Sequence, residues 1–289
     1  MNIEPYQPDR DREGVLAMLA EAPFFRAQFL AREAQGADAV FVARVDGVPA
    51  GLVSFAAGKY LRTRFTGYVA PAYRRRGIGG LLLRVMDGHY RESGWTERAA
   101  VLVPGAEDAA PRLLARHGFS RYCAQHVMER RGGPLPEGAF EIRPYADADY
   151  PAYAEIMADA FWNLREALRL APNFYTPPNA EERRAFAGRA GDRFVLTDGG
   201  TVVAAASVRG NELATLAVRP DVRGYGCGTA LAAHAVNEIL SRGCDGATLH
   251  CVDGNPAFRL YQRLGFEDVG LECEYAKYYR PESRPREKP

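Results

Sequence analysis

The sequence lacks the features that mark several large classes of protein. Its 37 basic and 36 acidic residues leave a formal net charge of +1, so it has no basic field that would hold nucleic acid. No apolar run approaches the ~18 residues of a membrane-spanning helix. The opening Met1-Asn-Ile-Glu has neither the basic start nor the apolar run of a signal peptide. We therefore expect a cytoplasmic protein that binds neither nucleic acid nor a membrane.

Cysteine is also scarce. The five cysteines are odd in number and scattered, which is typical of a reducing compartment and not of a disulfide framework. Neither they nor the five histidines show the spacing of metal ligands, so we expect no metal. With 289 residues, 47% of them hydrophobic, the chain is long enough for two ordinary globular domains.

The most informative stretch is an apolar strand that leads into a glycine-rich loop and then a helix. The strand covers residues 213–218 and the loop runs from Arg223 to Thr229. Glycines remove Cβ atoms and permit left-handed backbone angles, and the first turn of the helix adds unpaired N–H groups. The loop is therefore suited to hold phosphate. It is neither a Walker loop, because no lysine precedes Thr229, nor a dinucleotide fingerprint, because Leu231 replaces the third glycine.

The first half of the chain contains a second copy of this loop. The pattern Arg-x-x-Gly-x-Gly begins at Arg74 and again at Arg223, 223 − 74 = 149 residues later, which is about one domain length. Each half also has two strands around an Asp-Gly turn, at Asp46-Gly47 and Asp198-Gly199, and a Gly-Phe pair before its last strand. The chain is therefore a tandem repeat.

The breaks in this pattern predict the domain limits. We predict a first domain over residues 1–131, a linker over 132–139, a second domain over 140–280 and a disordered tail over 281–289. The linker is rich in glycine and proline, and the tail is rich in proline and charge.

The order of strands, glycine loop, helix and Gly-Phe pair resembles the GNAT superfamily of N-acetyltransferases, and the tandem is similar in architecture to the mycothiol synthases. The resemblance implies an α/β (α+β) fold of two tandem GNAT domains, each a mixed, centrally splayed sheet flanked by helices. It also implies acetyl-CoA as co-substrate. The sequence shows no side-chain pattern for the mycothiol synthase acceptor, so that substrate is not implied.

In this family the pantetheine arm of the donor pairs with the strand before the loop, and the pyrophosphate lies on the loop. By resemblance, the donor-binding residues of the second half are Leu216, Ala217, Val218, Arg223, Gly224, Tyr225, Gly226, Cys227, Gly228, Thr229 and Asn255. Those of the first half are Tyr68, Val69, Arg74, Arg75, Arg76, Gly77, Gly79 and Gly80.

Tyr261 is the candidate general acid. It lies between Asn255 and Gly265-Phe266, in a segment that resembles the family pattern around the tyrosine that protonates the departing thiolate. A phenol of pKa about 10 is well matched to a thiol of pKa about 8.5. The alternative is an aromatic side chain on the core face of a short helix.

Glu212 is the candidate general base. Strand alternation predicts that Glu212, Ala214, Leu216 and Val218 share one face, so the carboxylate would face the cleft and accept the amine proton. The alternative is a solvated carboxylate at a strand start. His250, on the adjacent strand, is a rival base, although a lone histidine there is more typical of a packed core residue.

The first half lacks both groups. Alignment of the repeats places Leu114 opposite Tyr261 and Thr63 opposite Glu212. We therefore expect a non-catalytic first domain that keeps a donor-binding loop or its remnant.

Together these features predict an acetyl-CoA-dependent N-acetyltransferase that acts on a primary amine of a small molecule by direct attack in the second domain. The alternatives are a protein or peptide N-acetyltransferase and a non-catalytic acyl-CoA-binding regulatory protein. We expect a monomer or homodimer. The acceptor is expected to contact the aromatic residues Phe161, Trp162, Phe174 and Tyr175.

Overall fold

The computed structural model describes residues 1–280 except 36–37, 59–60, 106–108, 171–177 and 179. The chain forms two compact units. Unit 1 contains Met1–Tyr122 and the segment from Glu274, and unit 2 contains Cys123–Cys273. The predicted tail over residues 281–289 lies outside the described residues.

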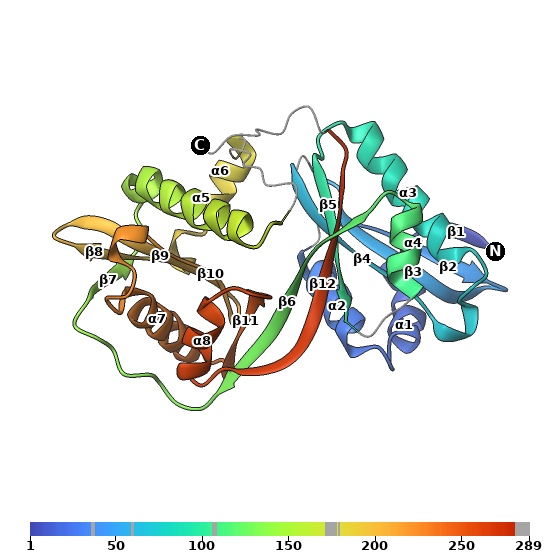
Figure 1. Ribbon diagram of the computed structural model, residues 1–289. Coiled ribbons are helices and arrows are strands. Elements are labelled where there is room, and N and C mark those ends of the chain that lie inside the picture. The colour runs from blue at the N-terminus through green and yellow to red at the C-terminus, as the bar shows by residue number, and fades with distance from the viewer. Residues whose placement is uncertain (36–37, 59–60, 106–108, 171–177, 179, 281–289) are drawn as a thin grey trace. The chain divides into compact units, whose positions relative to one another are not determined.

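Unit 1 is a mixed sheet with helices on both faces (Figure 1). Its elements are β1 (Asn2–Pro5), α1 (Pro8–Met18), α2 (Pro23–Gln35), β2 (Asp38–Val45), β3 (Val48–Ala56), β4 (Arg62–Val69), α3 (Ile78–Ser93), β5 (Arg98–Pro104) and α4 (Ala109–Arg116). Strands β1 to β4 are antiparallel neighbours, and β5 is parallel to β4. Two hydrophobic cores result: α1 and α2 pack on one face, and α3 and α4 pack on the other.

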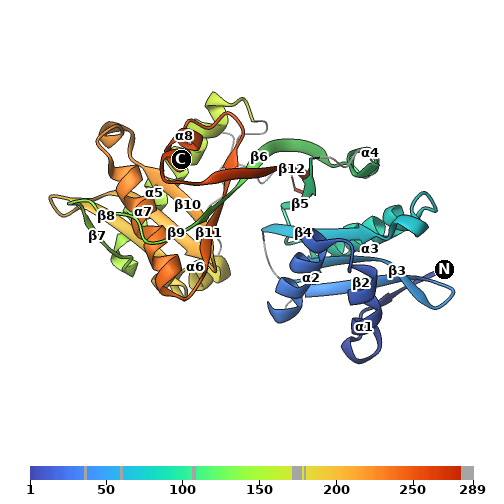
Figure 2. The ribbon, with the colours of Figure 1, turned by 90° about the horizontal axis from the view of Figure 1, so that it is seen from below.

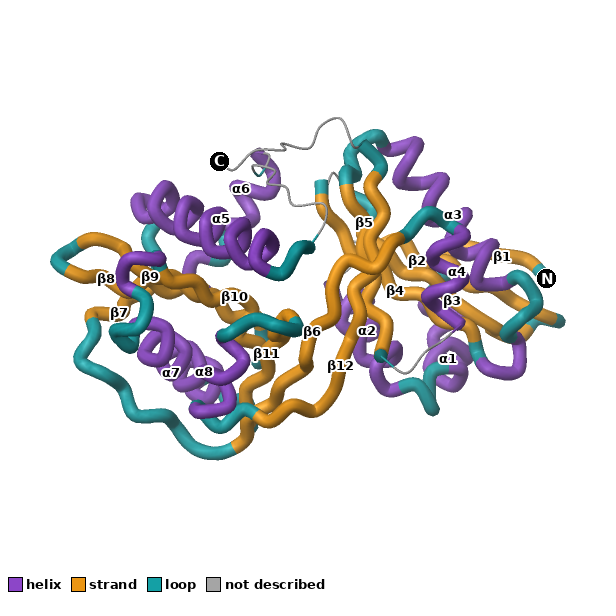
Figure 3. Tube along the Cα trace, viewed as in Figure 1, coloured by secondary structure: helices purple, strands orange, loops and turns teal. Residues whose placement is uncertain are grey.

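Unit 2 repeats this arrangement (Figure 2). Its elements are β6 (Ser120–Arg131), β7 (Glu141–Pro144), α5 (Tyr150–Ala167), α6 (Ala180–Ala187), β8 (Arg193–Asp198), β9 (Thr201–Arg209), β10 (Glu212–Val218), α7 (Cys227–Ser241), β11 (Gly246–Val252), α8 (Ala257–Arg263) and β12 (Glu267–Tyr278). The strand order is β12-β6-β11-β10-β9-β8-β7. Helix α5 covers one face of this sheet, and α7 and α8 cover the other (Figure 3).

Part of the last strand of each repeat belongs to the other compact unit. Residues 123–131 of β6 belong to unit 2, where β6 pairs with β11 from Arg131↔Gly246 to Gln125↔Val252. The end of β12 belongs to unit 1, where Glu274 pairs with Arg98 and the Tyr279 N–H donates to the Glu97 carbonyl at 2.8 Å. The compact units and the predicted sequence domains therefore differ in these two strands.

The two Asp-Gly hairpins differ in which residues form the turn. Asp46 and Gly47 have φ of 51° and 81° and separate the paired residues Val45 and Val48, so the first predicted turn is confirmed. In the second repeat the prediction is wrong by one residue. Asp198 is still in the strand, paired with Thr201, and the turn is Gly199-Gly200, with φ of 55° and 79°.

Among the described residues, none of the helices has both the length and the apolar character needed to cross a membrane.

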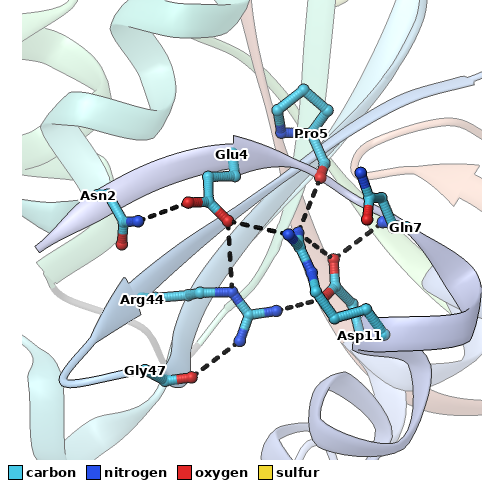
Figure 4. A network of polar contacts seen from close by, with 8 residues as sticks. Asn2, Glu4, Pro5, Gln7, Asp11, Arg44 and Gly47 are labelled. Carbon is cyan, nitrogen blue, oxygen red and sulfur yellow. Dashed lines mark hydrogen bonds and ion pairs between the residues drawn. The ribbon is translucent and has the colours of Figure 1, made fainter.

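A buried carboxylate ties α1 to the first strands of unit 1 (Figure 4). The Asp11 side chain is 0% exposed. It accepts hydrogen bonds from the Arg10 Nε at 2.6 Å and the Gln7 backbone N–H at 2.9 Å, and it also pairs with Arg44 on β2. The hydrogen bond from Arg10 is the main cause that lowers the Asp11 pKa. The Asp11 carboxylate therefore links the start of α1 to the β2–β3 hairpin.

We expect Asp11→Ala to lower the free energy of unfolding of unit 1 by about 3 kcal/mol, because it removes the buried anion that pairs with Arg10 and with the partly buried Arg44. Asp9→Ala, an exposed change in the same helical turn, should cost less than about 1 kcal/mol. Urea unfolding of the two variants checks this, and equal midpoints would contradict it.

Candidate active site

The site in unit 2 begins where two parallel strands separate. β10 and β11 pair at Glu212↔Thr248, at the start of β10, whereas β10 stays paired with β9 as far as Val218↔Ala204. Beyond the first pair, no strand of the described residues pairs with the β11-facing edge of β10. Such an edge accepts an extended chain as an added strand, and it contains the predicted residues Leu216, Ala217 and Val218.

The predicted loop closes the far end of this edge. Gly224 and Gly226 have φ of 86° and 92°, and Gly226 is the N-cap of α7, which no side chain of the described residues caps by a hydrogen bond. The first N–H groups of the helix therefore point outward without an intrahelical partner. Arg223 Nε donates to the Val218 carbonyl at 3.1 Å. This pairing fixes the loop against the end of β10.

The side chains of the loop divide by environment. Tyr225 is 76% exposed and Cys227 is 6% exposed in the core, so only the backbone of Cys227 faces the loop. A Cβ at Gly228 would lie 3.4 Å from both Val218 Cγ2 and Leu260 Cδ1. This glycine therefore lets α7 approach β10 and α8 closely.

Unit 1 repeats the loop geometry residue by residue. Arg74 Nε donates to the Val69 carbonyl, again at 3.1 Å, and Gly77, with φ of 82°, is the N-cap of α3. Arg75 holds a φ of 64° at the position that Gly224 occupies in the second loop. A non-glycine residue in this conformation costs about 1–2 kcal/mol. The loop of unit 1 therefore keeps the left-handed backbone angle although an arginine stands where unit 2 has a glycine.

The loop of unit 1 opens onto a pocket of about 720 Å³, which is the size of a small-molecule site. The pocket lies where β4 and β5 separate after Arg64↔Ala100. Its lining includes the predicted residues Tyr68, Val69, Arg74, Arg75, Gly77, Gly79 and Gly80, together with Arg112, Leu114 and Arg116. The remaining predicted residue, Arg76, lies over the Tyr73 ring at 5.5 Å. An apolar interior with arginines beside a glycine loop suits a phosphorylated ligand with an apolar arm.

Tyr261 lies on α8 and is 8% exposed within the core of unit 2. Its ring is 6.0 Å from that of Phe266, and burial strongly raises its pKa above the ordinary value of 10. The neighbouring Leu260 packs beside Gly228, so α8 contacts the glycine loop next to the position of Tyr261. Asn255 Oδ1 accepts the N–H of Ala257 at 3.0 Å, and this bond caps α8.

The repeats match at these positions. The N–H of Phe266 donates to the Tyr261 carbonyl at 3.0 Å, and the N–H of Phe119 donates to the Leu114 carbonyl at 3.0 Å. Leu114 is buried and lines the unit 1 pocket. The hydroxyl of Thr63, the counterpart of Glu212, lies 3.3 Å from Tyr90 OH. Unit 1 therefore has neither a phenol nor a carboxylate at the two aligned positions.

The predicted face for Glu212 is wrong. A register shift between Leu213 and Thr215 inserts a β-bulge at Ala214, and a bulge changes the alternation of side chains. Leu213, Leu216 and Val218 consequently share the α7 face. Glu212 lies on the opposite face, the one that α5 covers.

Glu212 and His250 are in contact on this face. His250 Nδ1 lies 3.0 Å from Glu212 Oε1, and Arg209 Nη2 donates to Glu212 Oε2 at 2.6 Å. Burial opposes ionisation of Glu212, but these bonds outweigh it and lower its pKa to about 2. The bond with Glu212, together with Glu272, raises the pKa of His250 to about 9. The two candidate bases therefore form one ion pair at neutral pH.

Glu272 on β12 is the residue that sequence reasoning missed. Its Oε2 lies 3.6 Å from His250 Nε2, on the side of the imidazole away from Glu212. No sequence pattern links Glu272 to a site, because strand pairing alone brings it near His250.

The aromatic residues expected to contact the acceptor are described only in part. Trp162 is buried in α5, and Phe174 and Tyr175 lie outside the described residues. No group of three histidine, cysteine, aspartate or glutamate side chains in the described part of the chain has an arrangement that could hold a metal ion.

The pH dependence of stability reports on the Glu212–His250 pair. The raised His250 pKa stabilises the fold below pH 6.5, and this contribution is lost as pH rises through about 9. The lowered Glu212 pKa stabilises above pH 4.5, and this is lost as pH falls through about 2. We therefore expect the coupling between Glu212→Gln and His250→Gln in a double-mutant cycle to be greatest between pH 4.5 and 6.5. Thermal unfolding across pH measures it, and a coupling that grows toward pH 9 would contradict the ion pair.

Two family models match the chain, one in each repeat. Residues 157–266 match the acetyltransferase (GNAT) family, and residues 36–121 match an acetyltransferase (GNAT) domain. The expected tandem of GNAT units is thus confirmed.

Curated relatives and solved structures agree with this assignment. The chain is 30% identical to the mycothiol acetyltransferase of Saccharomonospora viridis over 243 residues, 72% of each chain. It is 29% identical to that of Kineococcus radiotolerans, covering 85% of this chain and 83% of the relative. The fold is similar to a GCN5-related N-acetyltransferase from Sphaerobacter thermophilus, with a TM-score of 0.71, 18% identity, and coverage of 98% of this chain and 96% of that one.

Proposed function

The chain belongs to the GNAT acetyltransferase family, and we propose that unit 2 transfers the acetyl group of acetyl-CoA to a primary amine of a small molecule. One observation carries this proposal. The free edge of β10 ends at a glycine loop and a helix start without a side-chain cap among the described residues, and α8, which holds Tyr261, packs against this loop through Leu260. The cytoplasmic location and the monomeric or homodimeric state expected from the sequence are part of the proposal.

The residues of unit 2 fit the donor. The backbone of Leu216–Val218 pairs with the pantetheine amides, and the amides of residues 224–229 hold the pyrophosphate at the positive end of α7. Acetyl-CoA supplies the thioester carbonyl carbon, at which a C–N bond forms while the C–S bond breaks. The residues of unit 2 orient this carbon and transfer the protons of the reaction.

Tyr261 is the general acid in this proposal. Because burial raises its pKa, the phenol is fully protonated at neutral pH, and it gives its proton to the thiolate as the C–S bond breaks. The Glu212–His250 pair faces the side of the sheet that α5 covers and removes the proton of the amine. Acid and base thus act from opposite faces.

Two features support a small-molecule acceptor. Helix α5 packs over β9 and β10 on the face that holds Glu212, which narrows the approach for a folded protein. Relatives are named mycothiol acetyltransferase. A panel of free amines and one lysine peptide, assayed by release of the CoA thiol, tests this part. Turnover of the peptide alone would favour the protein acetyltransferase instead.

Unit 1 holds a second donor molecule without turning it over. The pocket beside its glycine loop supports this role, and Leu114 and Thr63 supply neither acid nor base. This is the observation that favours an acyl-CoA-binding role alongside catalysis.

The acid assignment predicts the effect of Tyr261→Phe. We expect kcat to fall at least about a hundredfold because general-acid assistance is lost, while the affinity for CoA is unchanged. Tyr145→Phe, a buried tyrosine of unit 2 whose hydroxyl bonds Asp147, is the matched control and should keep its activity. Steady-state kinetics and calorimetry with CoA measure both. Full activity of Tyr261→Phe would remove the acid role.

The two loops allow a paired test of which unit is catalytic. Gly77 and Gly226 are equivalent N-caps with left-handed angles, and alanine at either costs about 1–2 kcal/mol. We expect Gly226→Ala to lower kcat/KM about tenfold. Gly77→Ala should weaken one of two CoA-binding events and leave kcat/KM intact. The reverse result would place turnover in unit 1.

A further inference from the structure

One cluster in unit 2 has more components than the proposed function uses. His250 lies between two carboxylates, Glu212 at its Nδ1 and Glu272 at its Nε2. Its side chain is 29% exposed, whereas those of Glu212 and Glu272 are 18% and 11% exposed. The imidazole is therefore the member of the cluster that solvent and an acceptor reach most easily.

The two contacts of His250 differ in kind. At 3.0 Å, Nδ1 and Glu212 Oε1 are within hydrogen-bond distance. At 3.6 Å, Nε2 and Glu272 Oε2 are an ion pair without a hydrogen bond, and this buried oxygen has no other hydrogen-bond partner among the described residues. The Nδ1 proton is thus fixed toward Glu212, and the Nε2 proton can leave.

Strands β6, β9, β10 and β12 each place a charged group on the face of His250. Glu212 comes from β10 and is itself bound by Arg209 of β9. Glu272 comes from β12. On β6, Val127 stands opposite His250, and Glu129, paired with Thr248, lies on the same face. Helix α7 packs on the other face, so no residue of α7 meets the imidazole.

We propose that His250, and not Glu212, takes the proton from the acceptor amine, and that Glu212 and Glu272 are positioning residues that hold the imidazole from its two sides. The proposal rests on the proposed function and names its base. Glu212 already has two cationic partners, which makes it a weak proton acceptor. A carboxylate that fixes the Nδ1 proton of a histidine leaves Nε2 as the basic atom.

The proton balance is simple. Neutral His250 accepts one proton at Nε2 from the acceptor ammonium, and the free amine attacks the thioester carbonyl. The C–N bond forms, the C–S bond breaks, and the thiolate takes the Tyr261 proton. The second amine proton is lost as the amide forms and restores Tyr261 through solvent. His250 then releases its proton through its exposed edge.

Glu272 sets how much of His250 is neutral. Its negative charge beside Nε2 is one of the causes that raise the His250 pKa to about 9, so most of the imidazole is protonated at pH 7. We expect Glu272→Gln, which removes this charge at constant shape, to lower that pKa by about one unit. The rate at neutral pH should then rise about tenfold, because tenfold more of the base is free.

The test uses the full chain and two readouts. NMR titration of the labelled His250 imidazole, assigned by its absence in His250→Gln, needs no acceptor. The pH profile of kcat/KM uses acetyl-CoA with the best amine of the panel. Glu267→Gln, an exposed glutamate on the same strand, is the control and should change neither readout. Glu212→Gln should lower kcat and also lower the His250 pKa.

In Glu272→Gln we expect the midpoint of the His250 NMR titration to move to lower pH. The pH at which kcat/KM increases should move down with it, and turnover at pH 7 should be faster. An unchanged titration, or turnover at pH 7 that falls instead of rising, overturns the proposal. If wild-type protein acetylates no amine, the proposed function and the base role fail together, whereas an active wild type with an unshifted Glu272→Gln profile overturns this inference alone.

Discussion

The separation of two parallel strands is the constraint on which the rest of the molecule depends. In unit 2, β10 and β11 pair at Glu212↔Thr248 and then part, and in unit 1, β4 and β5 part after Arg64↔Ala100. Backbone groups at such an edge need partners. The bulge at Ala214 adds twist to β10 and directs Glu212 and Leu216 to opposite faces. In the proposed mechanism, Leu216 and the acid Tyr261 therefore belong to one side of the sheet and the base belongs to the other.

The two repeats share the geometry of their loops but differ in the polar side chains near them. Both loops keep the arginine that bonds the last strand carbonyl and the left-handed N-cap glycine. Unit 2, and not unit 1, has the tyrosine and the glutamate at the aligned positions, and His250 of unit 2 lies between two carboxylates. Unit 1 has leucine and threonine instead, with a pocket beside its loop. Conservation of backbone geometry and loss of polar side chains fit a unit that binds without reacting.

Much of the fold could be predicted because its signals are local. Glycines at fixed spacing, the Asp46-Gly47 turn and the Gly-Phe pairs each depend on a few neighbouring residues. The donor loop was predicted for the same reason. Three other features depend on pairing between strands that are distant in the sequence: the bulge at Ala214, the assignment of parts of β6 and β12 to the other unit, and the position of Glu272. No local pattern in a single sequence predicts them. Alternation alone therefore gave the wrong face for Glu212, and Glu272, 60 residues beyond it in the chain (272 − 212 = 60), was missed.

We propose above all that acetyl transfer takes place at the free edge of β10 in unit 2. A crystal structure of the protein with CoA bound tests this most directly. We predict the pyrophosphate within hydrogen-bond distance of the amides of residues 224–229, the pantetheine arm along Leu216–Val218 and the thiol sulfur next to the Tyr261 hydroxyl. A second CoA molecule in the pocket of unit 1 is compatible with this. CoA bound in unit 1 alone, with the loop of unit 2 empty at saturating CoA, would contradict the claim.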